Sequence, residues 1–153
     1  ESLFPKDILA SYRLICGWVV DSLGLMGIES EFKPINDIVV RGRKISGNAQ
    51  TRRGCVLLQH GTILYSVDAE RMFSLLRVSD EKIRDKMIAN VKERVTSISR
   101  ERNVPREGAY EAIFEGFTRG KEFEIGPVTP AETARAMALA SSRYMKAEWN
   151  RMR

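Results

Sequence analysis

The segment formed by residues 35–65 restricts the chain to folds that contain a β-sheet. It includes DIVVRGRKIS and CVLLQHGTILY, two stretches rich in β-branched and other apolar residues. Turn-like residues interrupt the segment at Arg41 and Gly42 and again before Gly54, as they do between the strands of β-hairpins. Gly61, inside the last apolar stretch, is typical of a bulge or of a ligand that closely approaches the backbone. The segment therefore predicts antiparallel hairpins.

Helical patterns flank these hairpins. Residues 5–28 place apolar side chains at spacings of three and four, which predicts a helix with one face on a core. Further helices are predicted over residues 68–76, 80–91, 103–120 and 129–149. Thr129 and Glu132 have the spacing of a capping box at the start of the last helix, and the alternation over 121–128 predicts a strand. The predicted fold class is α+β: a mixed, mainly antiparallel, hairpin-rich sheet packed by about five helices.

The positive charge of the chain is concentrated in one place. The whole chain has 25 Lys and Arg against 20 Asp and Glu, a formal net charge of +5. Between Asp37 and Asp68 there is no acid, and the cations there are Arg41, Arg43, Lys44, Arg52 and Arg53. Local charge of this kind indicates an anionic ligand at one site rather than a surface that coats nucleic acid. The alternative is that long cationic side chains protect an exposed hairpin edge.

The two cysteines bear on the cellular compartment. Cys16 and Cys55 lie in different apolar settings without the spacing of metal ligands, so we expect neither a disulfide framework nor a metal centre. The sequence has no run of 18 apolar residues and no secretion segment at its start. We expect a cytoplasmic protein with no membrane association.

The chemistry of the hairpin residues predicts an anion site. Lys44 follows a tight turn, and the small residues Gly47 and Ala49 come soon after it. Small residues let backbone N–H groups approach a ligand, while a lysine supplies a movable ammonium group for a phosphate or a carbonyl oxygen. From these residues alone the function is no more specific than an anion site on a hairpin.

Longer motifs resemble a known family. NDIVVRGRKISGNAQ, followed by LQHGTILY, is similar to the lipoate–protein ligases, whose catalytic domain is shared with the biotin protein ligases. The resemblance continues through DEKIRDKMIANVKERVTSI and reaches AEWN, so it covers nearly the whole chain.

The resemblance implies an adenylate-forming ligase. Lipoate and ATP, with Mg²⁺, would form lipoyl-adenylate, and the lipoyl group would pass to a lysine of a lipoyl domain. The acceptors would be lipoyl domains of 2-oxoacid dehydrogenase complexes or the glycine cleavage H protein. Lys44 would be the catalytic residue that binds the acyl carbonyl and the adenylate phosphate. The substrate- and adenylate-binding residues would be Asn36, Asp37, Gly47, Asn48, Ala49, His60, Gly61 and Thr62. The metal ligands are unknown, with Asp37 as a candidate.

Several of these residues also have a purely structural interpretation. Asp37 can be a turn former at the start of a strand, and His60 can be a satisfied structural histidine. Arg41 and Arg43 can be solvated turn cations, although either could contact pyrophosphate. Cys55 is expected to be a small core residue.

The chain departs from the family in one respect. It has no counterpart of the glycine-rich N-terminal half of the catalytic domain or of the C-terminal accessory domain. We therefore expect residues 1–153 to form a single domain that corresponds to the C-terminal part of the catalytic domain. A complementary N-terminal half would be needed for activity, and the accessory part could be a separate subunit.

Two other functions remain open. An octanoyltransferase of the same superfamily would take its acyl group from acyl carrier protein and would need a cysteine thiolate as nucleophile. Such relatives tend to have a cysteine just before the hairpin, where this chain reads ESEFKPIND. A non-catalytic basic binding module, for nucleic acid for example, is the third reading. The basic segment lacks the interleaved aromatic residues of such modules, so we expect no nucleic-acid partner.

Overall fold

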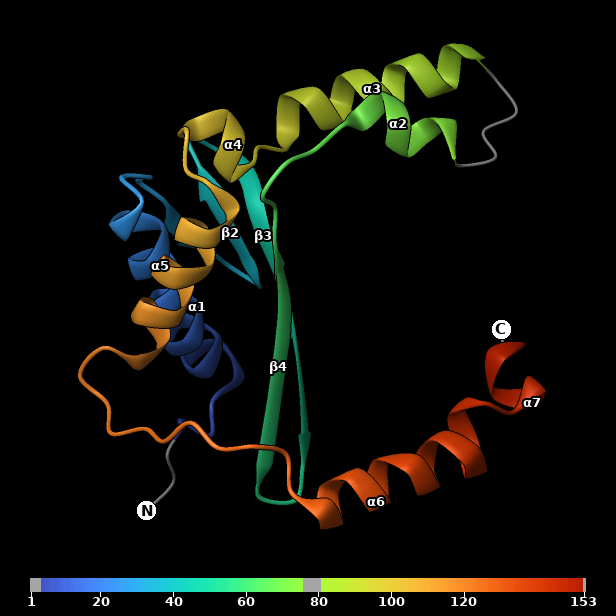
Figure 1. Ribbon diagram of the computed structural model, residues 1–153. Helices are drawn as coiled ribbons and strands as arrows, with labels where there is room; N and C mark the ends of the chain where they lie inside the picture. Colours follow the sequence, from blue (N-terminus) through green and yellow to red (C-terminus); the bar gives the residue numbers. More distant parts are fainter. Residues whose placement is uncertain (1–3, 76–80, 153) are drawn as a thin grey trace. The chain divides into compact units, whose positions relative to one another are not determined.

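A computed structural model describes residues 4–75 and 81–152 of the chain (Figure 1). Contacts divide the chain into two compact units, Glu1–Gly120 and Lys121–Arg153. The fold class is α+β, and the prediction of an antiparallel, hairpin-rich sheet packed by helices is confirmed. The expectation that residues 1–153 form a single domain stays a prediction.

The sheet of the first unit has four strands, all antiparallel, in the order β1-β2-β3-β4. They are β1 (Glu31–Lys33), β2 (Asp37–Val40), β3 (Arg43–Arg53) and β4 (Val56–Ile63). Arg41 and Gly42 join β2 to β3 with φ angles of 48° and 76°, as a type I′ hairpin turn requires. Gly54, with φ 58°, lies in the turn between β3 and β4. Both predicted hairpins are therefore confirmed, whereas the short strand β1 was not predicted.

A bulge interrupts the ladder between β2 and β3. Ile38 pairs with Ser46 and Val39 pairs with Lys44, so Ile45 is an extra residue on the longer strand. Ile45 is fully buried, and the alternation of side chains resumes on either side of it. The bulge therefore places the side chain of Lys44 on the face of the sheet opposite to that of Ile38.

Helix α1 (Ile8–Leu25) begins after Asp7, whose side chain accepts a hydrogen bond from the amide of Ala10 at 2.6 Å. Its 18 residues and mean hydropathy of 1.4 would be sufficient for a membrane-crossing helix by length and composition. The helix buries one stripe of these apolar side chains against the sheet, as its spacing predicted. The apolar side chains of this stripe are thus part of the core of the first unit.

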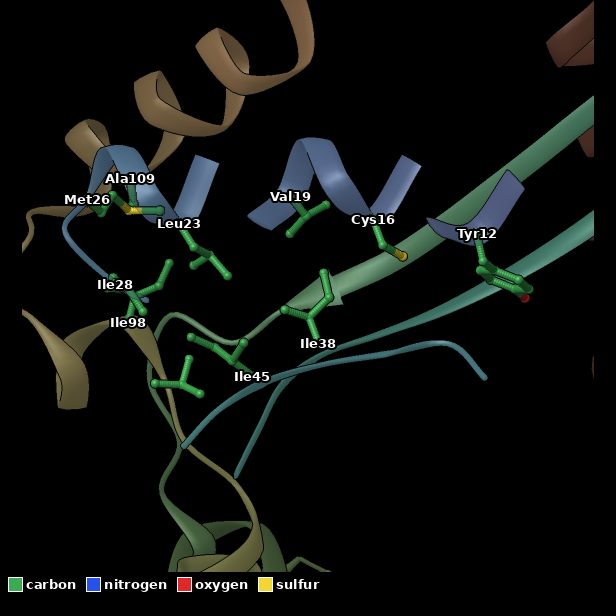
Figure 2. Packing of buried hydrophobic residues seen from close by; sticks show 11 residues of the cluster. Tyr12, Cys16, Val19, Leu23, Met26, Ile28, Ile38, Ile45, Ile98 and Ala109 are labelled. Atoms are coloured by element: carbon green, nitrogen blue, oxygen red, sulfur yellow. The ribbon is translucent and has the colours of Figure 1, made fainter. Parts of the chain in front are cut away.

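The core of the first unit lies between α1, the sheet and α5 (Arg106–Thr118). Figure 2 shows Cys16 and Leu23 of α1 directed toward Ile38 of β2 and Ile45 of β3. The remaining buried members of this cluster are Tyr12, Val19, Met26, Ile28, Val40, Ile98 and Ala109.

Helices α1 and α5 pack very closely at Gly116. A Cβ atom at Gly116 would lie 2.1 Å from Oγ of Ser22 and 2.8 Å from the carbonyl oxygen of Trp18. Ser22 donates a hydrogen bond to that same carbonyl oxygen at 2.6 Å, which keeps its hydroxyl against α1. The absence of a side chain at Gly116 therefore sets the separation of the two helices.

Three further helices belong to the first unit: α2 (Ala69–Ser74), α3 (Glu81–Arg94) and α4 (Ile98–Glu101). Asp68 caps α2 by accepting a hydrogen bond from the amide of Arg71 at 3.0 Å. The predicted start of the next helix at Asp80 lies outside the described residues. Helix α4 begins beside the end of β4, because the amide of Ile98 donates a hydrogen bond to the carbonyl of Leu64 at 2.9 Å.

The second unit contains α6 (Pro130–Leu139), a π-helical turn (Ala140–Tyr144) and α7 (Ala147–Asn150). Thr129 and Glu132 form the predicted capping box at the start of α6. The strand predicted over 121–128 is wrong, because these residues are exposed and belong to no strand of the described sheet. Their alternation has no partner strand to pair with, and a strand exists only through its ladder.

Candidate functional site

An open hollow of about 280 Å³ lies over the start of β3 and the end of β4. Its lining contains every predicted site residue except Asp37: Asn36, Lys44, Gly47, Asn48, Ala49, His60, Gly61 and Thr62. The structure thus brings together residues from two separate motifs. Whether each has the role that the family resemblance implies stays a prediction.

The register of the β3–β4 hairpin explains this gathering. Gly47 pairs with Thr62, Asn48 with Gly61, and Ala49 with His60. Residues directly opposite one another in an antiparallel pair have Cβ atoms about 5 Å apart. One stretch of small residues on β3 is therefore matched to the His-Gly-Thr stretch on β4.

Lys44 is held in a defined direction within this hollow. Its Nζ lies 2.6 Å from Oδ1 of Asp37, which is on the adjacent strand. A Cβ atom at Gly47 would lie 2.8 Å from Cε and 2.9 Å from Nζ of Lys44, so the lysine stem passes directly over this glycine. The lysine side chain remains 45% exposed. The ammonium group is therefore oriented by a carboxylate and still accessible to a ligand.

Asn36 and Asn48 fix the approach to β2 through reciprocal hydrogen bonds. The Asn36 side chain donates to the Asn48 carbonyl, and the Asn48 amide donates to the Asn36 carbonyl at 3.0 Å. The Asn48 side chain also donates to that carbonyl, at 3.1 Å. A Cβ atom at Gly61 would lie only 2.3 Å from Oδ1 of Asn48. Gly61 is therefore required by the Asn48 side chain, and it forms no bulge with β3.

Three arginines of the hairpins have polar partners within the fold. Arg41 and Arg43 both bind the carboxylate of Glu101, and Arg43 is only 25% exposed. Arg52 donates to Oγ of Ser11 at 2.6 Å and to two backbone carbonyls before α1. The interpretation of Arg43 as a solvated turn cation is wrong, because it misses this acidic partner.

Glu101 makes the stability of the first unit dependent on pH. Burial alone would raise the pKa of Glu101, but the hydrogen bond from Thr96 and the charges of Arg41 and Arg43 together lower it below its ordinary value of 4.5. A carboxyl group with a lowered pKa stabilises the fold above its ordinary pKa, and this contribution is lost as the pH falls.

We expect the free energy of unfolding of the wild type to exceed that of Glu101→Gln by a constant amount above pH 4.5 and by less below it. Urea titrations of both proteins between pH 3 and pH 7 measure this difference. A difference that grows as the pH falls would contradict the assignment.

Neither cysteine lies at the hollow. Cys55 is exposed in the turn between β3 and β4, so its prediction as a core residue is wrong. The length of β3 separates it from Lys44 by about 30 Å, at a rise of about 3.3 Å per residue. Cys16 is fully buried on α1, where burial raises the pKa of its thiol despite a hydrogen bond from Gln59 at 3.6 Å. Neither thiol is therefore positioned as an activated nucleophile beside Lys44.

Comparison with known proteins identifies the family. The model of the lipoyl protein ligase A/B catalytic domain matches residues 1–118. The chain belongs to this family. It is therefore a member of the lipoate–protein ligase family within the biotin/lipoate ligase superfamily, as the motifs predicted. The similar proteins described next include both ligases and octanoyltransferases.

Among curated proteins, this family member is similar to octanoyltransferases. It is 31% identical to the octanoyltransferase LipM of Geobacillus kaustophilus, over 95% of this chain and 62% of the relative. It is 37% identical to the LipM of Halalkalibacterium halodurans, over 95% of this chain and 63% of the relative. The chain thus spans less than two thirds of the length of these relatives.

Among solved structures, the similar proteins are lipoate ligases. A bi-partite lipoate protein ligase from Thermoplasma acidophilum superposes with a TM-score of 0.85 at 28% identity, over 98% of this chain and 60% of that chain. A lipoate-protein ligase A bound with ATP superposes with a TM-score of 0.75 at 24% identity, over 94% of this chain and 59% of that chain. The second similarity shows the fold alone.

Metal binding at the hollow depends on the side chains that the described residues place there. The described residues contain no group of three or more His, Cys, Asp or Glu side chains that could hold a metal ion. Asp37, the candidate ligand, has one oxygen paired with the Lys44 ammonium. A cation there would have to displace that pair, so this donor set does not fit a metal held by protein ligands alone. The magnesium requirement stays a prediction.

Sequence reasoning missed the acidic and amide groups that support the site. Glu101 lies far along the chain from Arg41 and Arg43, and no periodicity connects them. Gln50 and Gln59 face each other across β3 and β4 and are hydrogen-bonded at 2.5 Å. The pairing of the glutamines could have been predicted from the hairpin register, because polar side chains at directly opposite positions of two strands can form a hydrogen bond.

Proposed function

We propose that this chain forms the lysine-bearing part of an enzyme that activates lipoate with ATP and transfers the lipoyl group to a lipoyl domain. The observation that supports this most directly is the Lys44 ammonium, oriented by Asp37 above a hollow without a thiol. Acyl-adenylate formation needs positive charge where a carboxylate attacks phosphorus and where the carbonyl oxygen gains charge. It needs no protein nucleophile, because ATP activates the acyl group.

The residues of the hollow have distinct tasks in this proposal. The Lys44 ammonium binds the acyl carbonyl oxygen and the adenylate phosphate. Asp37 holds the ammonium in place, and the missing side chain of Gly47 leaves room for the lysine stem. Ala49, His60 and Thr62 line the opposite part of the hollow and contact the acyl chain or the ribose.

The rest of the enzyme and its partners belong to the same proposal. Because the chain spans only part of its relatives, we propose that a complementary N-terminal half completes the catalytic domain and that an accessory subunit joins it. The Thermoplasma acidophilum ligase was solved as a bi-partite enzyme in a study that included its E2 lipoyl domain, which supports an acceptor of this kind. A cytoplasmic location, with no nucleic-acid or membrane partner, remains expected.

An octanoyltransferase is the second candidate. The names of the curated relatives favour it over the ligase, since the similar proteins described above are octanoyltransferases LipM. The thiol chemistry favours the ligase, because thioester exchange requires a cysteine nucleophile. Cys16 is buried with a raised pKa, and Cys55 is at the far end of the hairpin. Family membership gives no support to the basic binding module.

One experiment separates the two enzymatic candidates. Lipoate-dependent ATP–pyrophosphate exchange is measured on this chain with and without its complementary N-terminal half, and transfer from octanoyl-acyl carrier protein is measured in parallel. The ligase predicts exchange that requires both halves and survives N-ethylmaleimide treatment. Octanoyl transfer without exchange, abolished by N-ethylmaleimide, would replace the ligase with the transferase.

A further inference from the structure

The carboxylate of Glu101, the last residue of α4, is only 4% exposed and has three partners. It accepts hydrogen bonds from the guanidinium groups of Arg41 and Arg43, the latter at 2.9 Å. Its Oε1 also accepts a hydrogen bond from the Thr96 hydroxyl at 2.5 Å. A buried carboxylate persists only when charges and hydrogen bonds compensate its desolvation. Here the compensating donors are Arg41 and Arg43, in and after the turn that precedes Lys44, and Thr96, which is hydrogen-bonded to Lys44.

Two routes connect Glu101 to the backbone of Lys44. The first passes through Arg43, the residue that precedes Lys44 in the chain. The second passes through Thr96, whose amide donates to the Lys44 carbonyl at 2.9 Å while its hydroxyl binds Glu101. The two routes end on the two peptide units that flank the Cα atom of Lys44.

The position of Lys44 makes these routes important. Lys44 borders the bulge in β3, where the ladder with β2 is irregular. Its carbonyl is bonded to Thr96, and Lys44 forms an isolated parallel bridge with Val95. The segment before α4 therefore supplies part of the backbone support that a regular ladder would otherwise give.

We propose that Glu101 is a positioning residue, which fixes the backbone of Lys44 and so aims its ammonium group into the hollow. The role of Lys44 in acyl activation rests on the proposed function, whereas the mechanical link does not. Without the negative charge, Arg41 and Arg43 lose the anion that anchors both, and the hydrogen bond from Thr96 weakens. The turn between β2 and β3 then loosens, and the lysine samples orientations away from Asp37 and Gly47.

The test compares Glu101→Gln with Glu115→Gln. Glu115 is a matched control, because it also pairs with an arginine, Arg119 at 2.8 Å, but is 55% exposed on α5. Limited acetylation with acetic anhydride, followed by peptide mass spectrometry, measures the reactivity of Lys44 relative to that of Lys92. Steady-state kinetics of lipoate activation are measured on the same proteins, assembled with the complementary half.

We expect Glu101→Gln to raise the Lys44 to Lys92 acetylation ratio several-fold and Glu115→Gln to leave it unchanged. We expect Glu101→Gln to lower kcat about 100-fold, the effect of an ångström-scale misplacement of a catalytic group, with KM changed less than about twofold. Thr96→Val removes one hydrogen bond only, and should shift both readouts in the same direction by less. If Glu101→Gln fails to fold, this variant provides the test.

An unchanged acetylation ratio in Glu101→Gln and Thr96→Val would overturn the positioning role, whatever the activity. A raised ratio, combined with full activity of Lys44→Ala, would leave the positioning role standing and would overturn the proposed function instead. A fall in kcat that is equal in Glu101→Gln and Glu115→Gln would also overturn the positioning role, because the two losses would then share a general structural cause.

Discussion

Replacing Lys44 by alanine is expected to lower the rate of lipoate activation by about a hundred- to a thousand-fold, the effect of removing one preorganised charge-stabilising contact. The Lys44 side chain lines the hollow, and Asp37 holds its ammonium group at 2.6 Å. KM for lipoate should change little, because the contact strengthens as charge develops on the reacting oxygens. ATP–pyrophosphate exchange with the complementary half present measures the loss.

Lys92→Ala is the matched control for this variant. Lys92 also pairs with a carboxylate at 2.6 Å, that of Glu70, and its side chain is 55% exposed against 45% for Lys44. Removing it deletes an equivalent surface ion pair from α3 without touching the hollow. Exchange should therefore stay at the wild-type rate. If both variants lose activity equally, or neither does, Lys44 is not the catalytic residue.

Replacing Gly116 by alanine is expected to lower the free energy of unfolding of the first unit by about 3 kcal/mol, the upper part of the range for overpacked cores. The added Cβ would lie 2.1 Å from Oγ of Ser22 and 2.8 Å from the Trp18 carbonyl oxygen. A rotation of Ser22 relieves the first contact, but the second is with backbone. Helices α1 and α5 must therefore separate. Urea unfolding monitored by circular dichroism measures the cost.

Gly108→Ala is the control on the same helix. The nearest atom to its Cβ would be 3.5 Å away, an ordinary contact. Helix propensity then favours alanine by about 1 kcal/mol, so this variant should equal or exceed the wild type in stability. Adding Ser22→Ala to Gly116→Ala should recover part of the loss only, because the Trp18 carbonyl remains in place. Full recovery, or equal effects at the two glycines, would contradict a backbone clash between the helices.

Local elements of this fold were predictable from the sequence because their causes are local. The left-handed φ of Arg41 and Gly42 is the requirement of a type I′ turn, and the capping box at Thr129 is made within four residues. The helix over α1 followed from spacing alone. The prediction of a strand over 121–128 was wrong because a strand depends on more than its own residues. Alternation within a segment does not supply the neighbouring strand that a ladder needs.

The candidate site was predictable only in part. The family motifs named the residues, and the hollow brings all of them together except Asp37. Their partners were not predictable in the same way. Cys55 begins an apolar motif in the sequence, yet the hairpin turn places it in solvent far from Lys44. The exposure of a residue also depends on what packs against it, and the neighbouring residues in the sequence do not show this.

The sequence by itself determined the hairpins and the amphipathic first helix, and it predicted Lys44 as the cation of an anion site. Steric limits on φ, side-chain periodicity and capping act over a few residues, so the order of residues is enough to set them. Only the tertiary structure decided which cations pair with which acidic groups. Glu101 reaches Arg41 and Arg43 across about sixty residues of chain because α4 packs beside the hairpin. Such a pairing is set by long-range packing, and it leaves Lys44, oriented by Asp37, to face the hollow.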